Sequence, residues 1–173
     1  MTKLIISKKK SLFFQNKGYL LIESIIAISI IVVGILGVLN LLSRSIGLNQ
    51  MVNDQFIGNY LAAEGIEIVK NIIDSNIING NPWNSGLSSS KSFEVDYRSN
   101  NLLDDNNSYL LFNPDTNFYS YEKGSQTRFI RTIKIVPVGM EEIKVNSIVK
   151  WDIKGVKFEI NLEDHFFNWR SST

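Results

Sequence analysis

The chain has 173 residues, and its 18 basic and 17 acidic side chains give a formal net charge of +1. This near balance argues against a nucleic-acid-binding protein, because such proteins usually carry a basic face. The absence of cysteine excludes disulfides, thiolate metal sites and cysteine-based catalysis. Once a long apolar segment near the N-terminus is set aside, about 130 residues remain, enough for one modest domain.

The positive charge is concentrated at the start of the chain. Residues 1–18 contain five lysines and no acid, so the remainder has 13 basic and 17 acidic residues and a net charge of −4. Lys8, Lys9, Lys10 and Lys17 precede the apolar segment, where charges that set membrane topology are found. The sequence therefore predicts that the N-terminus stays on the cytoplasmic side of a membrane.

The apolar segment runs from Tyr19 to Leu42, and Glu23 is its only charged residue. As a helix, this segment would be about 36 Å long, enough to cross a hydrocarbon core of roughly 30 Å. Only Arg44 is basic in the stretch that follows directly. We therefore expect a single membrane-spanning helix, with the rest of the chain outside the cytoplasm.

Three interpretations of this N-terminus compete. A secretory signal peptide requires a small-residue cleavage site after the apolar run, and the sequence after Leu39 has no A-x-A pattern. A plain membrane anchor is physically allowed but leaves Glu23 unexplained. The third interpretation is the leader of a type IV prepilin.

The residues Lys17-Gly18-Tyr19-Leu20-Leu21-Ile22-Glu23 resemble the type IV prepilin motif. The resemblance implies that a prepilin peptidase cuts after Gly18, that Tyr19 becomes the N-methylated first residue, and that Glu23 is the fifth. Most members of the family begin with Phe where this chain has Tyr19. Major pilins often carry a proline within the apolar helix, and this chain has none there, which favours a minor pilin or a pseudopilin.

A charged residue inside a bilayer costs roughly 2.5–3.5 kcal/mol on insertion scales, so Glu23 needs a partner or a reason to be there. The resemblance implies that Glu23 pairs with the free amine of Tyr19 on a neighbouring subunit and sets the register of a filament. The alternative is that Glu23 lies at the headgroup level and snorkels to water.

The helix is predicted to continue to about Asp74, because no proline interrupts it and its apolar residues keep helical spacing. The apolar face comprises Ile57, Leu61, Ala62, Ile66, Ile68, Val69, Ile72 and Ile73. Solvent-facing positions are Glu64, Glu67, Asn71 and Asp74. Residues 61–76 resemble the corresponding helix of PilV-type minor pilins.

The outer domain begins with a loop rich in Asn, Gly and Ser over 76–92. Strands are predicted at 92–97, 109–112, 118–121 and 129–138. An antiparallel hairpin is predicted from 143–153 and 156–162, joined by Lys154-Gly155, with its apolar side on the helix. Residues 163–169 are predicted as a short helical or irregular cap. Trp151, the glycine turn and Asn168-Trp169 again resemble the PilV-type pattern, which does not cover 77–127.

No catalytic or metal-binding constellation can be assembled from the sequence. His165 is the only histidine, and a lone histidine near a terminus usually belongs to polar surface. The Asp104–Asn107 stretch lacks the spacing and closing Glu of an EF-hand, so we expect a solvated loop. Phosphate-binding glycine motifs and a nucleophile elbow are also missing. We therefore expect no metal, no cofactor and no enzymatic activity.

The sequence as a whole predicts an α+β, pilin-like protein. Its expected parts are a removed leader (1–18), a transmembrane and filament-core segment (19–42), an amphipathic spine (43–75) and an extracytoplasmic β-sheet domain (76–173). The expected partners are prepilin peptidase, other pilin subunits, the inner-membrane pilus assembly platform and membrane lipid. The expected location is the cytoplasmic membrane and then a cell-surface pilus. The alternatives are a pseudopilin of a type II secretion or DNA-uptake system, and an anchored extracellular binding domain that never polymerises.

Overall fold

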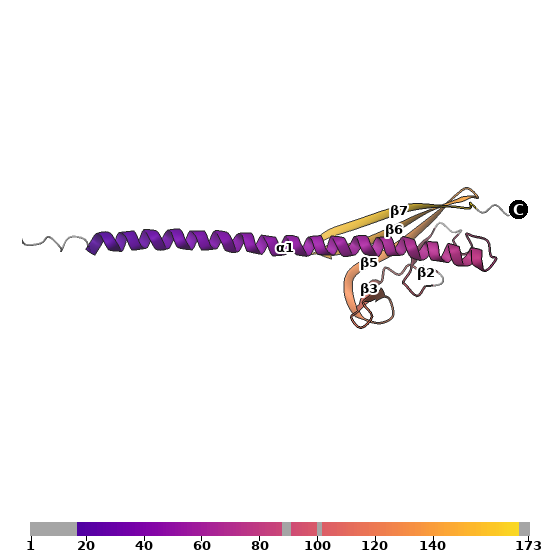
Figure 1. Ribbon diagram of the computed structural model, residues 1–173, viewed down its shortest axis with the longest axis horizontal. Helices are drawn as coiled ribbons and strands as arrows, with labels where there is room; N and C mark the ends of the chain where they lie inside the picture. The colour runs from indigo at the N-terminus through magenta and orange to yellow at the C-terminus, as the bar shows by residue number, and fades with distance from the viewer. Residues whose placement is uncertain (1–16, 88–90, 100–101, 170–173) are drawn as a thin grey trace, which may run out of the picture. The chain divides into compact units, whose positions relative to one another are not determined.

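A computed structural model describes residues 17–87, 91–99 and 102–169. The chain divides into two compact parts, Met1–Asn49 and Gln50–Thr173, and each is described by itself. Helix α1 (Lys17–Ile78) is followed by seven strands (Figure 1). These are β1 (Ser92–Glu94), β2 (Leu103–Asp104), β3 (Tyr109–Asn113), β4 (Phe118–Ser120), β5 (Ser125–Val138), β6 (Glu142–Ile153) and β7 (Val156–Phe167). The predicted α+β layout, a long N-terminal helix with an antiparallel sheet, is confirmed.

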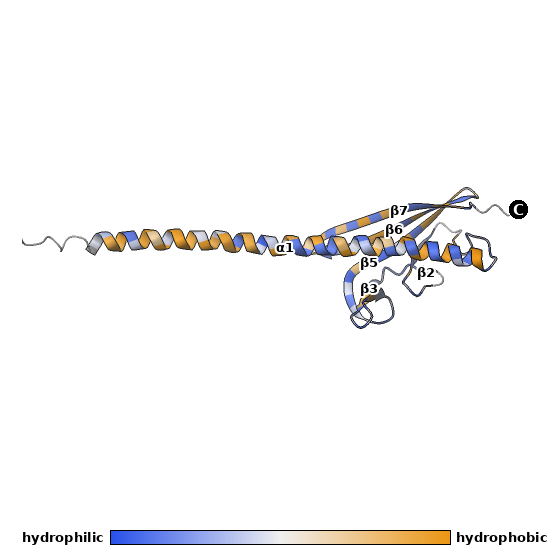
Figure 2. Ribbon diagram, in the orientation of Figure 1, coloured by the Kyte–Doolittle hydropathy of each residue, from blue (hydrophilic) through white to orange (hydrophobic). Residues whose placement is uncertain are grey.

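In the first part, the ribbon of α1 is coloured mostly as hydrophobic (Figure 2). Every residue from Gly18 to Asn49 is exposed, and α1 is long and apolar enough to cross a membrane. The hydroxyls of Ser24 and Ser29 donate to the carbonyls of Leu20 and Ile25, each at 2.7 Å. Because these hydroxyls are satisfied within the helix, they place no polar group on the surface that lipid or another helix would cover.

In the second part, all the strands pair antiparallel around β5. One edge of β5 pairs with β1 and β3, and the other edge pairs with β6, which in turn pairs with β7. The predicted β6–β7 hairpin is confirmed. Lys154 and Gly155 both have positive φ (53° and 85°), as a two-residue type I′ turn requires.

The predicted apolar face of α1 is also confirmed, and it packs on the sheet in two clusters. Ile57 is half-buried, and the other seven predicted positions are buried. One cluster gathers Ile66, Val69 and Ile73 with β5 and β6 residues such as Ile133 and Val145. The other gathers Leu61 and Ala62 with Phe129, Val149 and Trp151. Along each of α1, β5 and β6, a short stretch of residues separates the members of the two clusters. Within these stretches lie the residues here called the polar layer, Glu64 with Gly65 on α1, Arg131 on β5 and Ser147 on β6.

Gly65 allows α1 to approach the sheet closely at this polar layer. A Cβ at Gly65 would collide with Ser147 Oγ and lie 2.8 Å from Ile133 Cδ1. We therefore expect Gly65→Ala to lower the free energy of unfolding by about 1–3 kcal/mol, measured by urea denaturation in detergent micelles. Gly47→Ala is the matched control, because nothing lies within 4 Å of its Cβ position. Alanine there should be neutral or stabilising, and equal destabilisation by both changes would contradict the close packing.

Several predictions about the outer domain are wrong in extent or type. The predicted cap at 163–169 is mostly strand, since β7 continues to Phe167 and keeps its register with β6 as far as Glu142. Asp164 interrupts the alternation of apolar and polar residues along β7, which is why the sequence predicted an earlier end of the strand. Phe166 resumes the alternation and packs on the cluster that contains Ile133. Helix α1 ends at Ile78, inside the predicted loop, and Asn76 Nδ2 donates to the carbonyls of Trp83 and Ser85.

Two polar side chains are covered by their neighbours, one of them partly and the other fully. Glu64 was predicted to face solvent, but its side chain is only 15% exposed because it pairs with Arg131. Asn146 of β6 is buried, although it is a polar residue of the predicted hairpin. Its Nδ2 donates to Asn161 Oδ1 and Glu163 Oε2, so the two hairpin strands cover it with their own polar side chains.

Candidate functional site

The residues of the predicted cleavage site form the first turn of α1. The helix begins at Lys17, so Gly18 and Tyr19 already have helical backbone, and Tyr19 is 79% exposed. Glycine is a poor helix former, so Gly18 lowers the cost of opening the helix at this position. A protease that needs an extended backbone could therefore reach the bond after Gly18.

Glu23 lies one helical turn after Tyr19. Residues four apart occupy the same face of a helix, so the Glu23 carboxylate and the Tyr19 backbone share one side of α1. Glu23 is exposed and, among the described residues, has neither an ion-pair nor a hydrogen-bond partner. It is also the only charged side chain between Tyr19 and Leu42. The carboxylate is thus available to a positive group from outside the chain.

The predicted topology charges are only partly described. Lys8, Lys9 and Lys10 lie outside the described residues, and Lys17 is described by its backbone alone, at the start of α1. The structure therefore brings together Gly18, Tyr19 and Glu23, and it does not test the positions of the lysine side chains.

A buried arginine holds the helix and the sheet of the second part together, and the sequence analysis missed it. Arg131 of β5 is 0% exposed. Its Nη1 donates to Glu64 Oε2 at 2.6 Å and to the Leu61 carbonyl at 3.1 Å, and its Nη2 donates to the Val95 carbonyl at 2.5 Å. These contacts connect β5 with α1 and with the segment after β1, which indicates a structural role.

The lone histidine bridges two carboxylates across the β6–β7 hairpin. His165 Nδ1 lies 2.5 Å from Glu142 Oε1, and its Nε2 lies 3.3 Å from Glu163 Oε1. The hydrogen bond to Glu142, followed by the one to Glu163, raises the pKa of His165 above its usual 6.5. Hydrogen bonds from Asn146 and then His165 lower the pKa of Glu163. His165 is therefore more than passive polar surface.

These shifts predict how the stability of the hairpin depends on pH. The protonated His165 stabilises the folded chain below its unfolded pKa of about 6.5, and this contribution is lost as the pH rises through the raised pKa. The Glu163 contribution is present above its usual pKa of 4.5 and is lost as the pH falls through its lowered pKa. Thermal unfolding of His165→Gln should lack the decline on the alkaline side of pH 6.5. An unchanged pH profile would show that the bridge does not contribute.

Asp104 is the last residue of β2 (Leu103–Asp104), and a buried carboxylate holds the loop that follows it. Glu94 Oε1 accepts hydrogen bonds from the backbone N–H groups of Asn106 (3.1 Å) and Ser108 (2.6 Å). Among the described residues, no group of three or more His, Asp or Glu side chains could hold a metal ion. Asp105, Asn106 and Asn107 form the predicted loop, whereas Asp104 belongs to β2.

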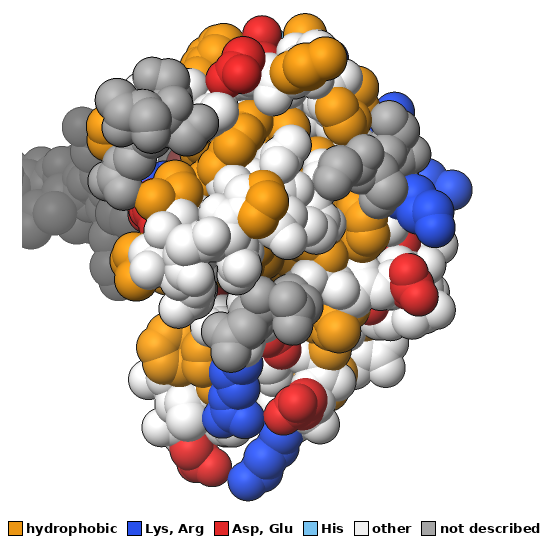
Figure 3. All heavy atoms as spheres, turned by 90° about the vertical axis from the view of Figure 1, so that its right-hand side faces the viewer, with side chains coloured by type: hydrophobic (Ala, Val, Ile, Leu, Met, Phe, Trp, Pro, Cys, Tyr) orange, Lys and Arg blue, Asp and Glu red, His pale blue; other side chains and the backbone are white. Residues whose placement is uncertain are grey.

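The end of the second part where α1 stops carries charges of both signs near its edge and apolar or uncharged side chains near its centre (Figure 3). A shallow groove of about 430 Å³ lies at this end, and its described lining includes Ile77, Trp83, Met140 and Asn168 without any charged residue. The described lining of this groove holds no acidic or basic side chain.

Comparison with protein-family models, with curated proteins and with solved structures gave no match.

Proposed function

We propose that the chain is a minor type IV pilin, made as a prepilin and incorporated into a pilus as a structural subunit rather than an enzyme. The observation that carries the proposal is the single carboxylate of Glu23, which has no partner among the described residues. It lies one turn after Tyr19 at the start of an otherwise apolar helix. A lone charge in this position is costly unless a specific partner compensates for it.

Removal of residues 1–18 would supply such a partner. Cleavage by prepilin peptidase after Gly18 leaves a positive amine on Tyr19, at the positive end of the helix dipole. That amine is destabilised in its own helix and is stabilised by a carboxylate from another molecule. Glu23 of an incoming subunit would pair with Tyr19 of a subunit already in the filament, at the inner-membrane assembly platform. The leader lysines would keep the N-terminus in the cytoplasm until cleavage.

The exposed apolar surface of α1 supports the same proposal. Tyr19–Leu42 exposes its apolar side chains throughout, and the burial of such a surface in lipid, and then among similar helices, drives first anchoring and then assembly. The sheet domain would be displayed outside the cytoplasm. A pseudopilin of a secretion or DNA-uptake system would use the same N-terminal chemistry.

The proposal is tested by shearing filaments from the host cell and detecting the chain in the filament and membrane fractions. A minor pilin is expected in the sheared filaments in small amounts beside a more abundant pilin. A chain that remains wholly in the membrane while secretion or DNA uptake fails without it would favour a pseudopilin. Membrane retention without either defect would favour an anchored binding domain and refute filament assembly.

A further inference from the structure

The β6–β7 hairpin extends beyond its ladder of hydrogen bonds with β5. The last pair between β5 and β6 is Ile130 with Lys150, whereas the β6–β7 ladder continues to Ile153 with Val156. The residues Trp151–Phe158 therefore form a two-stranded projection, here called the finger. A two-stranded ribbon is only marginally stable by itself, so the finger depends on contacts with other elements.

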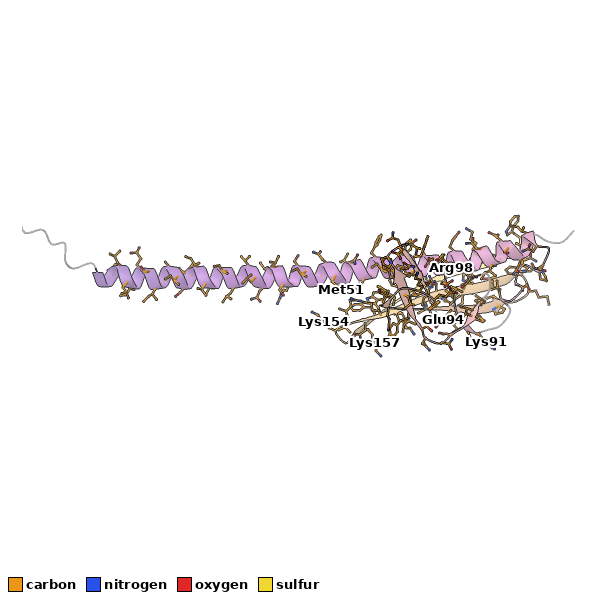
Figure 4. All side chains as sticks on the ribbon, turned by 90° about the horizontal axis from the view of Figure 1, so that it is seen from below. Met51, Lys91, Glu94, Arg98, Lys154 and Lys157 are labelled. Carbon is orange, nitrogen blue, oxygen red and sulfur yellow. The ribbon has the colours of Figure 1, made fainter. Side chains whose placement is uncertain are left out.

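Aromatic side chains pack the finger against α1, near the point where the second part of the chain begins. The rings of Trp151 and Phe158 stack at 5.6 Å with an interplanar angle of 14°. A Cβ at Gly58 of α1 would lie 2.9 Å from Trp151 Cζ3, so the indole packs directly on the helix backbone. Met51 of α1 and Phe158 also line one small cavity of about 80 Å³. The finger tip therefore lies at the Met51 end of this part, as Figure 4 shows for Lys154 and Lys157.

The tip of the finger combines positive charge with an exposed apolar side chain. Lys154 and Lys157 are exposed, and neither has an ion-pair partner in the described part of the chain. Val156 lies between them and is 57% exposed. One carboxylate, Asp152, lies within the finger opposite Lys157, so the two lysines leave residues 151–158 with a net charge of +1. Asp152 Oδ1 accepts the N–H of Gly155 at 2.8 Å, and Glu159 lies 3.6 Å from the Lys150 ammonium.

The opposite end of the same hairpin carries four acids, Glu141, Glu142, Glu163 and Asp164. Lys144 and His165 pair with two of them there, and the acids still outnumber the bases, so the hairpin is basic at one end and acidic at the other. The basic end is also the end tethered to the apolar segment. Met51 follows Leu42 by nine residues, which span at most about 30 Å of chain however the two parts are arranged. A contact that is weak in solution becomes effective when both partners are tethered this closely.

We propose that the finger is a membrane-contacting foot that binds the anionic headgroups of the bilayer in which the apolar segment is anchored. Lys154 and Lys157 attract the phosphates, and Val156 enters the interface between headgroups and acyl chains. This inference rests on the membrane anchoring in the proposed function and does not require filament assembly. Before incorporation, the contact holds the domain in one orientation on the membrane, and extraction into a filament must break it.

The absence of cysteine makes a site-specific test straightforward. The full chain carrying Val156→Cys is labelled with a polarity-sensitive fluorophore and reconstituted into vesicles of phosphatidylcholine, with or without phosphatidylglycerol. The emission should shift to the blue only in the anionic vesicles. High salt should abolish the shift, and so should Lys154→Glu with Lys157→Glu, since each lysine contributes about fivefold to such a contact.

A label at Met140→Cys is the matched control, because this side chain is 89% exposed in the turn at the acidic end of the hairpin. It should report water in both kinds of vesicle. Equal emission of the Val156 probe in the two vesicles, or a shift that survives charge reversal, would overturn the proposal. Flotation of the vesicles distinguishes a failure of membrane anchoring from a failure of the foot. A chain that fails to float refutes anchoring itself, whereas a floating chain with an unshifted probe refutes only the foot.

Discussion

Arg131→Ala is expected to lower the free energy of unfolding of the full chain by about 3–5 kcal/mol, because it leaves a network of buried acceptors without their donor. The guanidinium is fully buried and donates to Glu64, to the Leu61 carbonyl and to the Val95 carbonyl. Its removal leaves the Glu64 carboxylate, whose side chain is 15% exposed, without its cation. Urea denaturation in detergent micelles, followed by tryptophan fluorescence, measures the loss.

Arg98→Ala is the matched control for this prediction. The Arg98 side chain is 61% exposed and lies 3.3 Å from Glu122, which is also exposed. Exposed ion pairs contribute about 0–1 kcal/mol, so this variant should be close to wild type. Glu64→Gln keeps a hydrogen-bond acceptor but removes the charge, and it should fall between the two. If Arg131→Ala and Arg98→Ala were equally stable, the polar layer would have no role in joining α1 to the sheet.

Glu23→Ala is expected to be processed normally and to be lost from filaments. Removal of the acid makes insertion of the apolar segment easier, since a charge in a bilayer is unfavourable by roughly 2.5–3.5 kcal/mol. Failure to enter the membrane therefore cannot explain a loss of assembly. Breaking a buried ion pair typically costs 3–5 kcal/mol, which corresponds to about a hundredfold or greater drop in incorporation.

Glu67→Ala provides the control, because Glu67 is an exposed acid on the same helix and, within the described ranges, pairs only with Lys70 three residues away. It should assemble as the wild type does. Glu23→Gln preserves the shape but not the charge and should fail like Glu23→Ala. Both proteins are followed by the mass of the membrane form and by immunodetection in sheared filaments. Normal incorporation of Glu23→Gln would show that the charge of Glu23 is not used in assembly.

The features that sequence alone predicted are those set by local patterns. The apolar run after Tyr19, the buried face of α1 and the hairpin around Lys154-Gly155 each follow from spacing within one segment. The structure confirms the helix, the face and the hairpin. The cleavage site and the role of Glu23 remain predictions, because they concern a peptidase and a second subunit.

The features that were missed depend on residues far apart in the chain. Arg131 is buried because Gly65 lets the helix come close and because Glu64, 67 residues earlier in the sequence, supplies the opposite charge. The residues close to Arg131 in the sequence give no sign of this partner, and an arginine without a known partner is expected in solvent. The end of β7 was missed for a similar reason. The polar residues at the end of β7 form hydrogen bonds with β6, His165 with Glu142 and Glu163 with Asn146. Only the β6–β7 register brings these residues together.

The most direct test of the account is the N-terminus of the protein isolated from its own host. Mass spectrometry should find Tyr19 as the first residue, carrying one methyl group on its amine, with residues 1–18 removed. The cleavage that this result reports creates the positive amine with which Glu23 of a neighbouring subunit would pair. Recovery of the chain with residues 1–18 intact, or cut beyond Leu39 and released as a soluble monomer, would contradict the proposed assembly chemistry.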